Sequence, residues 1–345
     1  SERRMSGLFS FHGGLKTVRH KAESNQEAIR TSVLPRRLTV PLRQHIGAIA
    51  KPLVQAGDRV LKGQMIGQPD GYISAAIHAP TSGVVTAVDQ RPVPHPSGLP
   101  DWCVTIDSDG EERWIEREPV DYRRLHPTEL RNLLRNAGVV GLGGAAFPSA
   151  VKLNLSGHCE HLETLILNGA ECEPWITCDD RLMRERAAEI VAGLQVMAHL
   201  LEPREVLIGI EDDKPEAIAA MTAACAGTGY AVRAVPTRYP SGSVKQLVRL
   251  LTGKETPVDG LPIDVGVQCF NVATAYTVHR AVEYGEPVIS RIVTLTGHVN
   301  QPRNLEALLG TPFAELVAQC GGYRDGVERL IMGGPMMGFA LHSDE

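Results

Sequence analysis

The sequence predicts an α/β protein built from three folded parts that follow a polar N-terminal arm of residues 1–32. Three observations predict this class. Short β-prone runs separated by glycines fill residues 33–118, which indicates an all-β region. Buried strand patterns alternate with helix patterns over residues 119–286, which favours a mainly parallel sheet. From residue 287 to residue 345 the pattern changes again, to a smaller mixed unit.

Composition bounds the function. The 345 residues are enough for two or three domains, and a hydrophobic fraction of 43% is ordinary for a soluble protein. The net charge of −5 gives no reason to expect nucleic-acid binding. Apolar runs stay well short of about 18 residues, so we expect no membrane span, and we expect no secretory leader. Seven cysteines without a CxxC pair favour a reducing, cytosolic compartment.

The all-β region begins with the strand-like run Arg37–Leu42. The order of glycines and apolar residues between Val54 and Val85 resembles that of biotinyl- and lipoyl-like carrier domains, which display a modifiable lysine at a hairpin tip. The corresponding tip here, Pro69–Ile77, contains no lysine, so we expect a structural or docking barrel-sandwich without an attached group. Asp109–Gly110 is typical of a hairpin turn.

Periodicity and capping residues place the later elements. Thr128 is expected to cap the first helix, and the last unit resembles a small β-grasp domain. The expected elements are helix Thr128–Asn136, strand Leu162–Leu167, helix Asp180–Leu200, strand Glu205–Ile210, helix Pro215–Cys225, strand Ala231–Val235, helix Ser243–Leu251, strand Asp264–Phe270, helix Ala273–Tyr284, strand Ile289–His298, helix Leu305–Cys320 and strand Arg329–Met332.

A glycine-rich stretch, Gly141–Pro148, precedes Lys152 and is typical of a loop that approaches a phosphate. Pro148 can occupy the first turn of a helix, whose free N–H groups attract an anion, and Lys152 adds a positive charge. The spacing is neither GxGxxG nor GxxxxGK followed by Ser or Thr. An ordinary dinucleotide fingerprint and a P-loop are therefore not indicated.

Polar residues gather where predicted strands give way to loops and helices. Asn168, Glu171 and Glu173 follow one strand, Tyr239–Ser243 lies between a strand and a helix, and Asn271–Thr274 does the same. Parallel sheets bind ligands outside the carboxyl ends of their strands. We therefore expect these junctions to form one shared nucleotide site.

Four motifs together resemble the RnfC component of the Rnf (Rsx) electron-transport complex, a protein similar to the FMN- and NADH-binding subunit of respiratory complex I. They are GLGGAAFPSAVK at 141–152, NGAECEPWITCDDR at 168–181, YPSGSVKQL at 239–247 and NVATAY at 271–276. The resemblance implies a barrel-sandwich (lipoyl-like) domain at 33–118, a Rossmann-like FMN- and NADH-binding domain at 119–286 and a β-grasp (SLBB-like) domain at 287–345.

The resemblance also implies residue roles. Glycines would wrap FMN, Lys152 would meet its phosphate or ring, and polar residues of the junctions would hold the rest. Glu171 and Glu173 are the catalytic candidates, with Glu173 near the nicotinamide. The implied FMN residues are Gly141, Gly143, Gly144, Lys152, Asn168, Glu171, Tyr239, Gly242, Ser243, Asn271 and Thr274. The implied NADH residues are Phe147, stacking on adenine, Glu173 and Lys254.

Departures from the complex I pattern fall mainly on the NADH side. Leu142 and Ala170 stand where that pattern has Arg and Asp, Ser243 and Val244 stand where it has two Glu, and Leu155 replaces a second aromatic. The flavin cradle therefore keeps more of the pattern than the NADH cradle.

The function that the resemblance implies is electron transfer between NADH and iron–sulfur clusters. The chain would be a peripheral subunit of an ion-translocating NAD:ferredoxin oxidoreductase on the cytoplasmic face of the inner membrane. Other subunits, and ferredoxin or flavodoxin, would be its partners. Family members continue into a segment with two CxxCxxCxxxCP runs, which this sequence lacks. The 4Fe–4S clusters are expected in that missing segment or in partner subunits, and no metal site is expected in this chain.

Other hypotheses come from different classes. The chain could be a docking scaffold with a degenerate nucleotide fold, whose arm wraps a partner. It could also bind a polysaccharide or vitamin, as β-grasp modules of this type do. A zinc site would draw on His158, Cys159, His161, Cys172 and Cys178, but their spacing matches no common finger.

Overall fold

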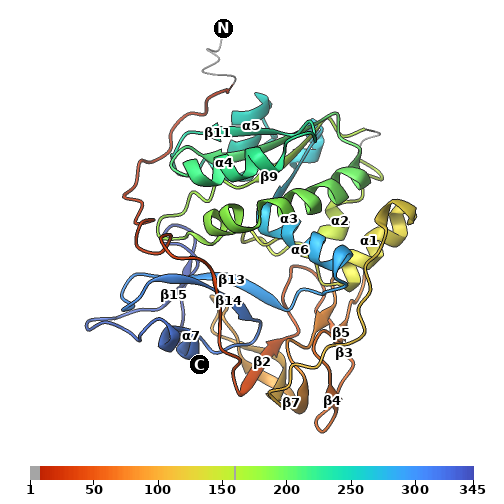
Figure 1. Cartoon of the computed structure of the whole chain (residues 1–345), viewed down its shortest axis with the longest axis vertical. Helices are drawn as coiled ribbons and strands as arrows, with labels where there is room; N and C mark the ends of the chain where they lie inside the picture. The colour runs from red at the N-terminus through yellow and green to blue at the C-terminus, as the bar shows by residue number, and fades with distance from the viewer. Residues whose placement is uncertain (1–7, 159–160) are drawn as a thin grey trace. The chain divides into compact units, whose positions relative to one another are not determined.

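The computed structural model describes residues 8–158 and 161–345, shown in Figure 1. The chain divides into two compact units. One comprises Ser1–Arg19, of which residues 8–19 are described, with Lys152–Pro174 and Asp179–His279; we call it the sheet unit. The other comprises His20–Val151, Trp175–Cys178 and Arg280–Glu345, and we call it the barrel unit.

The sheet unit is built on a parallel sheet of four strands in the order β11-β10-β9-β12. The central strand β9 is buried because its apolar side chains Leu165, Ile166 and Leu167 face helices on both sides. This confirms the predicted parallel sheet. The strands are β9 (Thr164–Asn168), β10 (Glu205–Glu211), β11 (Ala231–Val235) and β12 (Val267–Asn271).

Helices follow the strands, as predicted. The closest helix packing involves Gly193 of α3, where a Cβ atom would lie 1.7 Å from the carbonyl oxygen of Ala275 in α6. The predicted strand Asp264–Phe270 is too long, because a 3₁₀ turn that ends at Gly266 (φ 75°) occupies its first residues. The helices are α2 (Ser149–Lys152), α3 (Cys178–Leu201), α4 (Pro215–Ala224), α5 (Val244–Thr252) and α6 (Val272–Glu283), with the 3₁₀ turn η2 (Pro262–Val265).

The first part of the barrel unit is the predicted barrel-sandwich. Two antiparallel sheets, β2-β8-β7-β4 and β3-β5-β6, enclose a core that includes Leu38, Val40 and Ile66. The lysine-free tip connects β5 to β6. The strands are β2 (Arg37–Pro41), β3 (Lys51–Pro52), β4 (Arg59–Val60), β5 (Met65–Gln68), β6 (Ile77–His78), β7 (Gly83–Pro92) and β8 (Pro100–Ser108).

The hairpin predicted at Asp109–Gly110 is wrong. Gly110 has φ 76° and makes a turn, but Trp114 beyond it bridges to Lys62 instead of returning to β8. Strand β8 already pairs with β2 on one edge and with β7 on the other, so no edge is left for a hairpin partner.

The helix α1 (Pro127–Asn136) begins one residue before the predicted start, after the 3₁₀ turn η1 (Tyr122–Arg124). The predicted cap is wrong, because His126 is the N-cap residue. Its Nδ1 accepts a hydrogen bond from the N–H of Thr128 at 3.2 Å, and Glu129 reaches back to the His126 N–H at 2.9 Å. Proline at the first helical position needs no hydrogen-bond partner for its nitrogen, so the helix starts there.

The C-terminal part of the barrel unit corrects one predicted helix. Leu305–Cys320 is not continuous, because β14 pairs with β13 along six residues and Gly310 (φ 92°) separates it from a short helix. Residues at the end of the predicted arm add a parallel strand to the same sheet. The elements are β1 (Arg30–Thr31), β13 (Ser290–Leu295), β14 (Arg303–Leu308), α7 (Phe313–Gln319), β15 (Ile331–Met332) and β16 (Phe339–Ala340).

Candidate functional site

Two asparagines lie next to each other at the carboxyl ends of β9 and β12, where Asn168 and Asn271 are register partners. The Nδ2 of Asn168 donates to the carbonyl oxygen of Gly242 at 2.8 Å, and its Oδ1 accepts from the N–H of Ala170 at 3.1 Å. Asn168 therefore fastens the loop after β9 to the loop before α5. Two of the predicted junctions are thus brought together.

Asn271 begins helix α6. Its Oδ1 accepts from the N–H of Ala273 at 2.8 Å, and its Nδ2 donates to Oδ2 of Asp179 at 2.7 Å. Thr274 lies in the first turn of the same helix with its side chain fully buried. The start of α6 therefore joins the predicted site, although the Asn271 amide already has a carboxylate partner.

Glu171 has a left-handed backbone (φ 52°) and turns its carboxylate onto the start of α3. The carboxylate accepts from the N–H groups of Asp179 at 2.6 Å and Asp180 at 3.1 Å. A carboxylate at this place satisfies free N–H groups and interacts favourably with the helix dipole. Glu171 thus shapes the loop that carries Glu173, which is partly buried.

The loop before α5 contains Tyr239, Gly242 and Ser243. Burial, together with the charges of Glu173 and Cys172, raises the pKa of the Tyr239 hydroxyl. At Gly242 a Cβ atom would lie 2.9 Å from Sγ of Cys172, so this loop can approach the loop after β9 only without a side chain there. Ser243 is the exposed N-cap residue of α5.

Lys152 lies beside β12. Its Nζ donates to the carbonyl oxygen of Cys269 and stands 4.3 Å from the ring centre of Phe270. Burial lowers the pKa of this lysine. Among the residues that the structure describes, no carboxylate lies within ion-pair distance of Nζ. Lys152 is therefore a cation close to the strand ends that lacks a counter-charge.

Lys254 is not brought to this place. Its Nζ pairs with Glu163 and donates to the carbonyl oxygen of Val265 at 2.8 Å. Glu163 immediately precedes β9, and Val265 lies shortly before β12, so these partners are at the amino ends of the strands. Amino and carboxyl ends lie at opposite edges of a parallel sheet, and we therefore exclude Lys254 from the site.

The glycine loop belongs to the barrel unit, where it is closed by its own backbone. Gly141 donates to the carbonyl oxygen of Phe147 at 2.8 Å and accepts from Ala146 at 3.1 Å. Gly143 and Gly144 are exposed, Gly144 has φ 115°, and Phe147 is half-buried. The roles of these residues with FMN and NADH stay predictions.

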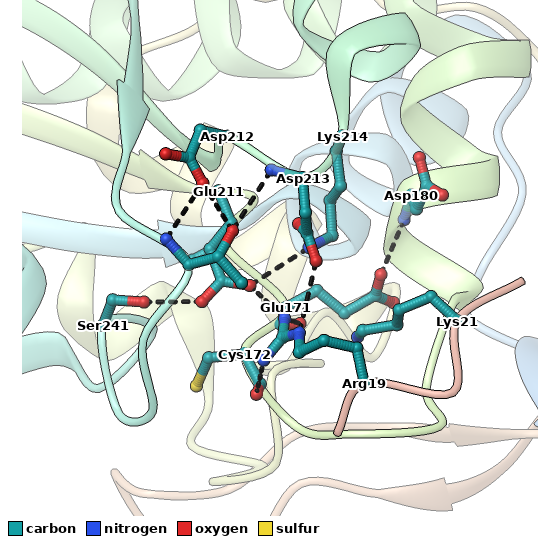
Figure 2. Close-up of polar contacts among 12 residues, drawn as sticks. Arg19, Lys21, Glu171, Cys172, Asp180, Glu211, Asp212, Asp213, Lys214 and Ser241 are labelled. Atoms are coloured by element: carbon teal, nitrogen blue, oxygen red, sulfur yellow. Dashed lines mark hydrogen bonds and ion pairs between the residues drawn. The ribbon is translucent and has the colours of Figure 1, made fainter. Parts of the chain in front are cut away.

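A buried ionic cluster at the end of β10 escaped the sequence reasoning (Figure 2). Glu211 is fully buried and pairs with Arg19 and Lys214 of the same unit. The signal for Glu211 was available, because it ends a strand beside the strand that ends at Asn168. Arg19 lies in a weakly patterned arm, and no local pattern singles it out.

The zinc hypothesis gains no support. Cys159 lies outside the described residues. Cys172 is a free cysteine, and burial raises the pKa of its thiol, which disfavours the thiolate that binds zinc.

Comparisons with protein-family models now define the class of protein. Residues 134–280 match the Nuo51 FMN-binding domain, residues 9–111 the RnfC barrel sandwich hybrid domain, and residues 292–340 the SLBB domain. The chain is therefore a protein with an FMN-binding type of domain between a barrel-sandwich and an SLBB domain. This confirms the predicted fold class.

Curated relatives identify the family. Three proteins named as the C subunit of an ion-translocating oxidoreductase complex match: 53% identical in Pseudomonas aeruginosa, over 98% of this chain and 44% of that protein; 49% in Rhodobacter capsulatus, over 97% and 65%; and 47% in Vibrio cholerae, over 97% and 43%. The chain belongs to the family of these C subunits of ion-translocating oxidoreductase complexes. It spans about half the length of most of these relatives.

Among solved structures, the fold resembles that of an NAD⁺-reducing NiFe hydrogenase. The air-oxidized state matches with a TM-score of 0.52 at 19% identity, over 60% of this chain and 41% of that chain. The H₂-reduced state matches with a TM-score of 0.51 at 20% identity, over 61% and 42%. Within the described ranges, no helix combines the length and apolar character that a membrane crossing requires.

Proposed function

We propose that this chain binds FMN at the carboxyl ends of β9 and β12 and passes electrons between NADH and 4Fe–4S clusters. The observation that carries the proposal is Lys152, a cation without a carboxylate partner beside β12, inside the region that matches the Nuo51 FMN-binding domain. A phosphate would supply the missing counter-charge.

The residues present fit FMN. The N–H groups at the start of α6 attract an anion, and Asn271 and Lys152 lie on the same strand or beside it. Asn168 and Gly242 bring the neighbouring loop close by a hydrogen bond and by the absence of a side chain. The set therefore offers a phosphate end and a polar wall, as a flavin mononucleotide requires.

When bound, FMN supplies a centre that takes up a hydride and releases electrons one at a time. This chain's residues would bind and orient it. Lys152 would balance the phosphate or the ring, and Asn168 would keep the loop after β9 in place. Glu173 would face the nicotinamide, and Phe147 would stack on the adenine.

The wider assembly is part of the proposal. The relatives are named as subunits of an ion-translocating complex, which supports partner subunits that couple electron transfer to ion transport. We propose a peripheral position on the cytoplasmic face of the inner membrane, exchange of electrons with ferredoxin or flavodoxin, and iron–sulfur clusters outside this chain. Domain boundaries at residues 32, 118 and 286 are proposed as well.

The test is the visible spectrum of the purified chain with added FMN, followed by NADH under anaerobic conditions. We expect bound flavin absorption that bleaches with NADH, and loss of the bound flavin in Lys152→Ala. A chain that takes up no FMN would overturn the proposal. Flavin that binds but ignores NADH would leave FMN binding standing and overturn the NADH role.

One observation favours the docking scaffold as a second candidate. The side chains of Glu171 and Asn271 already have partners within the chain, namely the start of α3 and Asp179. A scaffold could keep these residues for folding alone. Unchanged folding and partner binding with no flavin uptake would favour it.

A further inference from the structure

The ionic cluster at the end of β10 joins three segments of the sheet unit, as Figure 2 shows. The Glu211 carboxylate, with 0% exposure, accepts from Oγ of Ser241 at 2.6 Å and from Nζ of Lys214 at 3.2 Å, and it pairs with Arg19. Ser241 lies in the loop before α5, beside Gly242. The buried carboxylate therefore fixes that loop to the strand end.

Arg19 carries the cluster to the other loop. Its Nη1 donates to the carbonyl oxygen of Cys172 at 2.8 Å, and its Nη2 lies 3.5 Å from the carbonyl oxygen of Glu171. Its Nε also donates to Asp213 at 3.2 Å. One guanidinium thus connects the Glu171–Glu173 loop with Glu211, and through Glu211 with Ser241.

The arm that supplies Arg19 follows the same loops along its backbone. Leu15 and Tyr239 exchange two backbone hydrogen bonds, of 2.7 and 2.9 Å. Further back, the Phe9 N–H donates to the carbonyl oxygen of Leu250 in α5 at 2.9 Å. Residues 9–19 therefore lie against the sheet unit, at the segment that contains the proposed flavin residues.

The charges within the cluster balance. Burial acts to lower the pKa of Lys214, yet the carboxylates of Glu211, Glu171 and Asp213 together raise it, so the lysine stays charged. Arg19 is the second cation for these acids. Without it, Glu211 and Asp213 would share one lysine, and the buried excess of negative charge would be costly.

We propose that Arg19 is a positioning residue of the FMN site, which holds the loops at Glu171–Glu173 and Tyr239–Ser243 at their working separation. The proposal rests on the proposed function and deepens it, because it makes the N-terminal arm part of the cofactor site. A planar guanidinium suits this place because it presents several donors in fixed directions, whereas a lysine ammonium is a single compact charge.

The test compares FMN dissociation constants, measured by quenching of flavin fluorescence, for the intact chain, Arg19→Ala and Arg19→Lys. We expect the constant to rise about tenfold or more in Arg19→Ala and by a smaller factor in Arg19→Lys. Arg37→Ala is the matched control, because it removes another guanidinium that makes two hydrogen bonds to one carboxylate, Asp107, in the barrel unit. Its FMN dissociation constant should not change.

A purely structural arm would give a different result. Arg19→Ala would then lower the melting temperature of the FMN-free chain while leaving the FMN dissociation constant unchanged well below that temperature, and this outcome overturns the inference. Glu211→Gln provides an independent variant: it should weaken FMN binding, and adding Arg19→Ala should weaken it little further. Strictly additive losses would also contradict the inference. If the intact chain takes up no FMN, the proposed function itself fails first.

Discussion

Nδ2 of Asn271 donates a hydrogen bond of 2.7 Å to Oδ2 of Asp179, which joins the end of β12 to the first turn of α3. Asn271 also accepts from Ala273 at the start of α6. A carboxylate therefore stands next to the helix start at which we place the FMN phosphate. This carboxylate repels a bound phosphate, unless the asparagine releases it on binding.

The first prediction concerns this carboxylate. Asp179→Asn should lower the FMN dissociation constant about fivefold at low salt, or about 1 kcal/mol, because a like charge near the phosphate is removed. The gain should shrink as salt is added. Titration with riboflavin, which lacks the phosphate, is the control and should show no gain. An equal gain for riboflavin would place the phosphate elsewhere.

The second prediction concerns the pH dependence of FMN binding. Burial lowers the pKa of Lys152 in the free chain, and a bound phosphate would raise it again. Binding then favours protonated lysine, so FMN affinity should be full below the free-chain pKa and fall as pH rises through it. Dissociation constants measured above about pH 7, where the phosphate is largely ionised, would show the slope. In Lys152→Gln the slope should vanish, and a slope that persists would assign it to another group.

The same shift predicts a change in stability, which makes the third prediction. Between the lowered folded pKa and the normal unfolded pKa, the unfolded chain binds more protons, so this group adds stability as pH rises. At lower pH the charged lysine is a burden on the FMN-free chain. Lys152→Met should therefore raise its melting temperature by a few degrees near neutral pH while abolishing FMN binding. A lowered melting temperature would show that the charge is well solvated.

The fourth prediction tests the contact between the two loops. Gly242→Ala should destabilise the chain by about 1–3 kcal/mol, because the new Cβ would lie 2.9 Å from Sγ of Cys172. Removing that sulfur in the double variant Gly242→Ala with Cys172→Ala should restore most of the loss. Urea unfolding of both variants gives the measurement, with Cys172→Ala alone as the reference. A loss that the second substitution leaves unchanged would point to another neighbour.

The fifth prediction tests the cap of α1. His126→Ala should cost about 1 kcal/mol of stability, because the N–H of Thr128 loses its acceptor. Thr128→Ala should cost much less, because its hydroxyl accepts only from the exposed Arg131. Thermal unfolding of the two variants distinguishes them. If Thr128→Ala costs more, the cap that the sequence favoured is the right one.

Most strands and helices of the sheet unit could be predicted because their signals are local. Strand β11 and helix α4 follow their apolar patterns, and glycine marks the end of α5 at Gly253. The segment Leu305–Cys320 could not be predicted, because its apolar residues fit a helix equally well. Only pairing with β13 makes its first part a strand.

The sequence by itself determined the fold class, the family and the gathering of Asn168, Gly242 and Asn271 at strand ends. These follow from hydrophobic period, from motifs and from the geometry of parallel strands. The tertiary structure alone decided which charges meet. It buried Glu211 against Arg19, far away in sequence, and it moved Lys254 to the opposite edge of the sheet. Ion pairs and long-range pairing depend on three-dimensional proximity, and a local pattern does not encode it.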